Sequence, residues 1–294
     1  MNEFLQYMLS GVMVGGIYAL VALGFVIIYK SSKVINFAQG QLVMFGAFIL
    51  WVFLVTFAIP LPAALLLGLG CAVLMGFLID RLTIRPLIGQ PLLAIIAMTI
   101  GLAVFLDAIS IPIFGGNDRG YPGYFPIGGM AIGNLSISYE YLWSFIVAMV
   151  LFGAFAWFFR YSMTGLAMRA VAEGHDTARA AGVKVRNAFT WSWIIACVSA
   201  MVGGFLLGNI ECVTPGLSTI GLKAFPVVLL GGLESIPGCI VGGAIVGILE
   251  MLAAGYLDPL TGGGMTEVMP FVIMILVLLF KPYGLFGEVR IERI

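Results

Sequence analysis

Long apolar runs, one after another, constrain what this chain can fold into more than any other feature. A helix needs about 20 apolar residues to cross the hydrocarbon core of a bilayer. The runs that reach or approach this length are residues 5–29, 41–59, 62–79, 91–113, 140–159, 188–210, 239–256 and 267–280. Of the 294 residues, 62% are hydrophobic and only 10% are charged, a balance outside the range of soluble domains. We therefore predict an all-α integral membrane protein, with residues 1–294 forming a single domain.

A ninth apolar segment, residues 224–236, is shorter than the others. Pro226 and Pro237 bracket it, and a Gly-Gly pair lies inside it. This pattern predicts a broken or partly crossing helix, which a membrane tolerates only where protein or a cavity satisfies the freed backbone groups. We therefore expect a polytopic helix bundle of about eight or nine spans.

The distribution of Lys and Arg predicts the orientation of the bundle. If the N-terminus faces outside and all nine segments cross, only Arg119 and Lys223 are left outside. The inside loops then hold Lys30, Lys33, Arg81, Arg85, Arg160, Arg169, Arg179, Lys184, Arg186, Lys281, Arg290 and Arg293. This asymmetry agrees with the positive-inside rule and places the C-terminus in the cytoplasm. Residues 114–139, rich in Gly, Pro and aromatics, are then an external loop with a short hairpin or an interfacial piece.

Two Gly-rich segments share a layout. Residues 15–46 and 203–243 each run from a helix with a Gly-Gly pair, through a polar linker, into an interrupted helix. With the orientation above, the first begins outside and the second begins inside, so they are predicted to be inverted-topology repeats. Transporters often place their substrate path between such repeats. The alternative is that small residues only let membrane helices pack closely. The pattern favours transport.

Three polar side chains lie where the first polar linker joins the next helix. Asn36, Gln39 and Gln41 are costly at membrane depth unless they face a cavity or each other. They are candidates for lining a pathway or for fixing a kinked start of the helix. Asn36 is also well suited to cap the helix that follows it.

Four acids, Asp107, Glu211, Glu234 and Glu250, lie in or near apolar runs, which makes each a candidate for function. Glu211 lies near the predicted outer surface, Glu250 near a helix end, and Glu234 where it could cap free backbone N–H groups. Asp107 is the deepest of them and has no obvious cation nearby. We expect it to contact another helix or subunit and assign it no part in substrate binding.

Patterns for catalysis or nucleotide binding are missing from the sequence. The only histidine lies in a charged loop, so neither an intramembrane Ser–His pair nor a His-rich metal site can be built. The four cysteines have no paired spacing, and we expect no metal site. Without a G-x-x-x-x-G-K-[ST] motif, the chain has no P-loop of its own. We expect neither an enzyme nor a nucleic-acid-binding protein, and any ATP that powers transport must bind to another subunit.

Residues 160–187 are the longest charged segment, and the charge count places them in the cytoplasm. Within them, residues 176–182 (DTARAAG) predict a short helix that Asp176 caps and Gly182 ends. Such a helix could dock in a groove of a soluble partner. The alternative is a solvated loop with incidental helicity.

Five segments, in order along the chain, carry a resemblance to a known family. They are GGIYALVALGFVIIY (15–29), INFAQGQLVMFGAF (35–48), RYSMTGLAMRAVAEGHDTARAAGV (160–183), KAFPVVLLGGLESIPGCIVGG (223–243) and VLLFKPYGLFG (277–287). Over nearly its whole length the chain resembles the LivH-type permeases, membrane subunits of ATP-driven importers for branched-chain amino acids. The family usually has His and Glu where Gln39 and Gln41 stand, and often Gly in place of Glu234. Related permeases serve importers of urea, short amides and aromatic or other organic acids, which stay open as alternatives.

The resemblance implies a set of partners. A second, LivM-type permease subunit would pair with this chain in the lipid bilayer of a prokaryotic cytoplasmic membrane. Two cytoplasmic ATPase subunits would bind ATP and magnesium, so this chain itself would carry no cofactor. An extracytoplasmic solute-binding protein would deliver the substrate. The rival from another class is an ion-coupled carrier or a channel that needs no ATPase.

The resemblance also implies roles for particular residues. The loop around residues 172–182 matches the family's coupling helix, and the residues expected to couple to the ATPase are Arg169, Glu173, Asp176, Thr177, Arg179 and Gly182. The segments around 36–44 and 225–237 match its paired broken helices near the pathway. The residues expected to shape that pathway are Asn36, Gln39, Gln41, Met44, Pro226 and Glu234.

Overall fold

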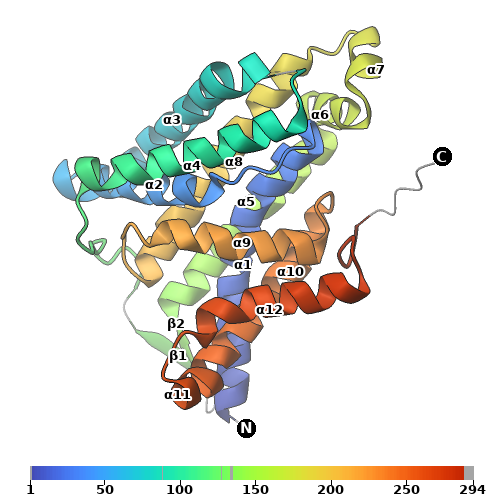
Figure 1. The fold of residues 1–294 in the computed structure, drawn as a ribbon. Helices are drawn as coiled ribbons and strands as arrows, with labels where there is room; N and C mark the ends of the chain where they lie inside the picture. Colours follow the sequence, from blue (N-terminus) through green and yellow to red (C-terminus); the bar gives the residue numbers. More distant parts are fainter. Residues whose placement is uncertain (1, 88, 127, 133–134, 288–294) are drawn as a thin grey trace.

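The computed structural model describes residues 2–287 except 88, 127, 133 and 134. In these residues the chain is a helix bundle with one short hairpin (Figure 1). The apolar helices are α1 (Asn2–Ser32), α2 (Gln39–Trp51), α3 (Leu61–Ile79), α4 (Leu92–Phe114), α5 (Tyr139–Tyr161), α8 (Val185–Ile210), α9 (Leu217–Gly231), α10 (Ile236–Leu252) and α12 (Met265–Phe280). Within the described residues, seven of them, some lengthened by short helical turns, are long and apolar enough to cross a membrane, whereas α9 and α12 are shorter. The predicted all-α polytopic membrane fold is confirmed.

Shorter elements connect these helices. They are the π-helical turns η1 (Val52–Thr56), η2 (Asp80–Ile84) and η4 (Ala253–Leu257), the 3-10 turn η3 (Arg85–Leu87), and the helices α6 (Met163–Glu173), α7 (His175–Ala180) and α11 (Asp258–Thr261). In the loop before α5, β1 (Gly129–Ile132) pairs antiparallel with β2 (Leu135–Ser138). This pairing confirms the predicted short hairpin.

Helix α1 lies at the centre of the bundle. Of its most apolar window, 94% is buried inside this chain, against 17% for α4. The apolar side chains that α3, α4 and α5 leave exposed are suited to lipid or to another subunit, since a membrane helix need not bury them within its own chain. Close packing at the centre depends on small residues, because a Cβ added to Gly15 of α1 would lie 2.3 Å from the carbonyl oxygen of Gly243 in α10.

The helices pack as two repeats of opposite direction. Helices α1 and α8 are antiparallel neighbours, since Gly24 lies beside Ser199 and Val21 beside Gly203. Each is followed by a linker, residues 33–38 or 211–216, and then by a shorter helix, α2 or α9. Helix α3 packs on α8 as α10 packs on α1, and α2 meets α9 at the middle. Exchanging α1, α2 and α3 with α8, α9 and α10 therefore reproduces the packing, as inverted repeats require.

Two boundaries differ from the sequence-based expectation. The ninth segment, predicted at residues 224–236, is the helix α9 at Leu217–Gly231, and residues 232–235 form the turn before α10. Its 15 residues extend about 22 Å, short of the hydrocarbon thickness. Lys223 was expected in an external loop and instead lies within this helix, mostly buried. Pro226 was expected to bound the ninth segment but lies inside α9, because a proline is tolerated within a packed membrane helix.

Candidate functional site

The linker after α1 leads the chain back into the bundle. Gln39, the first residue of α2, donates from Nε2 to the carbonyl oxygens of Ala196 in α8, at 3.3 Å, and of Val21 in α1, at 3.5 Å. Val21 precedes the last residue of α1 by eleven residues, about 16 Å along the helix. Helix α2 therefore begins deep among its neighbours, as expected of a broken membrane helix.

Asn36 and Gln39 fix the start of α2. The Nδ2 group of Asn36 donates to Oε1 of Gln39 at 3.0 Å, and its Oδ1 accepts the N–H of Ala38 at 3.1 Å. Both side chains are fully buried. Of the roles considered from the sequence, the geometry shows the two residues holding the kinked start of the helix. Whether they also border a substrate path stays a prediction.

The start of α2 crosses the start of α9 with the two backbones in contact. A Cβ added to Gly221 would lie 1.9 Å from the Cα of Gly40, so only glycine fits at this point. Pro226 lies further along α9 and is buried, and Met44 is buried in α2. In the same region, Phe225 packs against the rings of Phe25 and Phe37. The crossing brings together the two segments that the sequence predicted to be paired broken helices.

Glu234 lies apart from this crossing, at the turn between α9 and α10. Its carboxylate pairs with Lys33 at 2.6 Å, and its backbone oxygen accepts from Lys30 at 2.8 Å. The N-cap of α10 is Ser235, which accepts from the N–H of Gly238, so Glu234 is not the cap of that helix. Its predicted place on the pathway stays untested.

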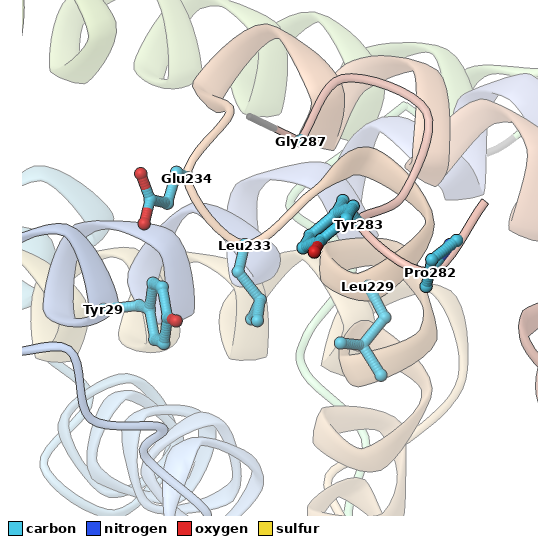
Figure 2. Close-up of a pocket in the computed structure, with 7 residues that line it drawn as sticks. All are labelled: Tyr29, Leu229, Leu233, Glu234, Pro282, Tyr283 and Gly287. Atoms are coloured by element: carbon cyan, nitrogen blue, oxygen red, sulfur yellow. The ribbon is translucent and has the colours of Figure 1, made fainter. Parts of the chain in front are cut away.

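Glu234 borders a small pocket of about 170 Å³ (Figure 2). The residues lining it are Tyr29, Leu229, Leu233, Glu234, Pro282, Tyr283 and Gly287. In Figure 2, Leu233 lies between Tyr29 on one side and Tyr283 on the other. The segment after α12 closes this end of the bundle, since the N–H of Leu285 donates to the carbonyl of Leu230 at 2.8 Å.

A buried ion pair joins α9 to α10, and the sequence did not predict it. Lys223 and Glu250 approach to 2.5 Å, with side-chain exposures of only 14% and 5%. Among the described residues, the second carboxylate oxygen of Glu250 is buried and has no geometric hydrogen-bond partner. Glu250 was set aside as lying near a helix end, but α10 continues through η4. The available signal was one basic and one acidic residue in neighbouring apolar runs.

The charged segment 160–187 folds into two short helices at one end of the bundle, opposite the N-terminus (Figure 1). The sequence did not predict the first of them, α6. Ser162 is its N-cap and accepts from the N–H of Gly165 at 2.9 Å. Met168 and Val171 are its buried face. A serine cap before apolar residues three apart was the available signal.

Helix α7 is the predicted short helix with a shifted start. It begins at His175 after Gly174, so Asp176 is not its N-cap; of the Asp176 side chain the structure gives no description. The predicted end is confirmed, because Gly182 has a φ of +81° and its N–H donates to the carbonyl of Arg179. The N–H of Val183 donates to the carbonyl of Ala178, which completes a Schellman motif.

The predicted coupling residues lie on this helix pair. Glu173, Thr177 and Arg179 are exposed, whereas Ala178 is buried and faces the bundle. Arg169 is partly buried, with its guanidinium 5.9 Å from the ring centre of Phe159. A cleft between α7 and α8, lined by Arg179, Val183, Lys184, Val185, Arg186 and Asn187, adds basic side chains to this end.

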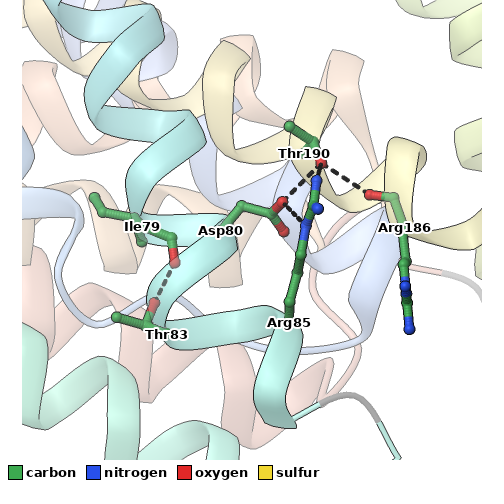
Figure 3. Close-up of polar contacts among 6 residues, drawn as sticks. All are labelled: Ile79, Asp80, Thr83, Arg85, Arg186 and Thr190. Atoms are coloured by element: carbon green, nitrogen blue, oxygen red, sulfur yellow. Dashed lines mark hydrogen bonds and ion pairs between the residues drawn. The ribbon is translucent and has the colours of Figure 1, made fainter.

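A second cluster ties the start of α8 to the end of α3 (Figure 3). The buried Asp80 carboxylate lies 2.8 Å from Nε of Arg85 and 2.7 Å from the hydroxyl of Thr190. Arg85 also donates to the Thr190 hydroxyl at 2.9 Å. Thr190 lies one turn after Arg186, so the cluster anchors α8 just beyond the helix pair α6–α7. The sequence did not predict this cluster.

Comparisons with known proteins agree with this architecture. The family model for the permease component of branched-chain amino acid transport systems matches residues 7–278. A high-affinity branched-chain amino acid transport system permease protein, BraD of Pseudomonas aeruginosa, is 30% identical over 99% of this chain and 98% of its own length. LivH of Escherichia coli K12 is 32% identical over the same shares. The probable LivH permease of Methanocaldococcus jannaschii is 28% identical over 95% of this chain and 91% of its own length.

The family match covers most of the described bundle, including both repeats and the helix pair α6–α7. It confirms the resemblance that the sequence motifs indicated. The chain belongs to the family of permease components of branched-chain amino acid transport systems.

Proposed function

We propose that this chain is the membrane permease subunit of an ATP-driven importer that moves branched-chain or other hydrophobic amino acids across a prokaryotic cytoplasmic membrane. Beyond membership of the permease family, the proposal specifies the partner subunits of this chain and its orientation in the membrane. A LivM-type permease pairs with the chain, two ATPase subunits bind ATP and magnesium in the cytoplasm, and a solute-binding protein supplies substrate outside. The N-terminus faces outside and the C-terminus the cytoplasm.

The observation that carries the proposal is the helix pair α6–α7. It presents Glu173, Thr177 and Arg179 to solvent on a short helix with a well-formed C-cap, at the end of the bundle where α1 ends and α8 begins. A short, exposed helix on an otherwise apolar bundle suits docking in a groove of a soluble partner. Asp176 and Arg169 belong to the same docking surface.

Several contacts lead from this surface into the bundle. Ala178 packs into the bundle, and the guanidinium of Arg169 lies over the ring of Phe159. The hydrogen bond between Asp80 and Thr190 anchors the first turns of α8. Further along α8, Ala196 accepts from Gln39 at the start of α2. A displacement of α6–α7 would thus reach the crossing of α2 and α9. ATP shifts the equilibrium between outward- and inward-open states only if the ATPase dimer binds one state better, and this surface supplies that preference.

The pathway runs past this crossing in the proposal. Gln41, Met44 and Pro226 border it, Asn36 and Gln39 hold its shape, and Glu234 lies at its cytoplasmic end with Lys33. Alternating access needs broken helices that can shift at a fixed crossing, and the α2–α9 contact has that form.

The test is ATP-dependent uptake of radiolabelled leucine into proteoliposomes containing the permease pair, both ATPases and the binding protein. Replacing residues 176–179 by Gly-Ser should abolish uptake and release the ATPases, with the permease pair still folded. The control replaces residues 116–118 in the external loop, where uptake should persist. Uptake that continues without the ATPase subunits overturns the proposal and favours a carrier or channel. Uptake of urea, amides or organic acids in place of leucine overturns the substrate class.

A further inference from the structure

The membrane helix α4 carries an exposed carboxylate, that of Asp107, whose role the fold does not explain. Asp107 lies in α4, seven residues or about 10 Å before the helix ends, and its side chain is exposed in this chain. On the same flank, Ile100 two turns before it and Ile111 one turn after it are apolar and exposed as well. Because a carboxylate is costly in hydrocarbon, this flank must face water or protein.

Asp107 lies at the crossing of the two broken helices. The hydroxyl of Ser218, in the first turn of α9, lies 3.4 Å from Oδ1 of Asp107 and 3.0 Å from the carbonyl oxygen of Pro215. The backbone oxygen of the same serine touches Gly40, since a Cβ added there would lie 2.1 Å away. The carboxylate is therefore beside the point where α2 and α9 meet.

Gln41 adds a second oxygen at the same level. Helix α4 runs alongside α2 in the same direction, because Thr99 hydrogen-bonds the carbonyl of Ile35 and Phe114 stacks on Phe48. Asp107 falls between these two contacts, level with the first turn of α2. Gln41 lies one and two turns before Phe45 and Phe48, on the side of α2 that faces α4.

The site is rich in acceptors and poor in cations. The Oε1 atom of Gln41 is buried and has no hydrogen-bond partner among the described residues. The nearest basic residue along α9, Lys223, is paired with Glu250, and Arg119 lies over the ring of Trp51 at 4.3 Å. Since none of the ion pairs among the described residues includes Asp107, its carboxylate and the amide oxygen suit a ligand that brings its own N–H donors. An ammonium group supplies three of them.

We propose that Asp107, with Ser218 and Gln41, binds the α-ammonium group of the amino-acid substrate as it passes the crossing of α2 and α9. The proposal rests on the proposed function and names the chemistry by which the permease itself recognises its substrate. Ser218 lies beside the carboxylate, and the oxygen of Gln41 accepts a further hydrogen. The apolar flank of α4, with Ile100 and Ile111, borders the hydrophobic side chain of the substrate.

Asp107→Asn in the complete reconstituted complex tests the role of the charge. Leucine uptake is measured against the concentration of leucine-loaded binding protein, with recovery of the partner permease measured by co-purification. The KM should rise about tenfold, because a charge-assisted hydrogen bond becomes a neutral one. Asp107→Glu should lie between wild type and Asn. The matched control, Asp118→Asn in the external loop, should leave the KM unchanged.

Two results overturn the proposal. One is an unchanged KM for Asp107→Asn, and the other is loss of the partner permease on purification, which would make Asp107 a subunit contact. A failure of the proposed function is distinguishable, because the wild-type complex itself would then take up no leucine.

A second measurement does not depend on turnover. In Asp107→Cys, a water-soluble thiosulfonate reagent should label position 107 above the background of the parent chain, and leucine-loaded binding protein with ATP should slow the labelling. Labelling that never exceeds the background, or that is indifferent to leucine, overturns the proposal.

Discussion

At the scale of single residues, the Lys223–Glu250 pair is a buried charge contact between α9 and α10. Replacing only Lys223 by Met leaves a buried carboxylate unpaired, which costs about 3–5 kcal/mol. Replacing both residues, Lys223→Met with Glu250→Leu, removes the charge and should recover most of the stability. Thermal unfolding of the purified permease in detergent measures both. A double variant as unstable as the single one would contradict an ion pair whose members serve mainly to neutralise each other.

Gln39 is a second residue whose contacts predict a measurable effect. Gln39→Leu removes the bonds to Ala196 and Val21 and leaves the amide of Asn36 unpaired. The expected loss is about 1–3 kcal/mol, because a buried polar group is left unsatisfied. Thermal unfolding is again the measurement. Gln39→Met and Gln39→Leu should behave alike, and a stable pair of variants would show that these hydrogen bonds do not hold α2.

At the scale of elements, the crossing of α2 and α9 depends on two glycines. Gly221→Ala places a methyl group 1.9 Å from the Cα of Gly40, so the two helices must separate. Since overpacking costs about 1–3 kcal/mol or more, we expect lower thermal stability and loss of uptake. Gly101→Ala is the control, because nothing lies within 4 Å of an added Cβ there. Normal uptake by Gly221→Ala would show that the crossing is not tightly packed during transport.

The C-cap of α7 gives a separate prediction for coupling. Gly182→Val forces a β-branched residue to a φ of +81°, at a cost of about 1–3 kcal/mol. This helix lies at the surface, so the bundle should stay folded while ATP-driven uptake and ATPase binding weaken. Co-purification of the ATPase subunits measures the effect. Gly153→Val, in open space on α5, is the control and should bind the ATPases normally.

At the scale of the whole molecule, the sequence predicted what periodic hydrophobicity and glycine patterns can encode. The nine apolar segments, the short hairpin before α5 and the repeated layout all follow from local composition. It did not predict pairings between distant segments, such as Asp80 with Thr190 or Lys223 with Glu250, because a single sequence does not show which polar side chains meet. The sequence did not predict the exposure of the Asp107 side chain either, because that exposure depends on how α4 packs.

Because of this packing, locating one helix end on either side of the membrane determines the orientation of the whole chain. Because α1 and α8 are antiparallel neighbours and both meet α6, the side of α7 determines the side of every helix end in the bundle. With Lys223 inside a helix, Arg119 is the one basic side chain that the orientation leaves outside among the described residues. We expect an impermeant maleimide to label Asp118→Cys in intact spheroplasts and Thr177→Cys only in inverted vesicles, each above the labelling of the parent chain. Labelling of Thr177→Cys in spheroplasts would place α6–α7 outside, where no ATPase could reach it, and the charge asymmetry would then need another cause.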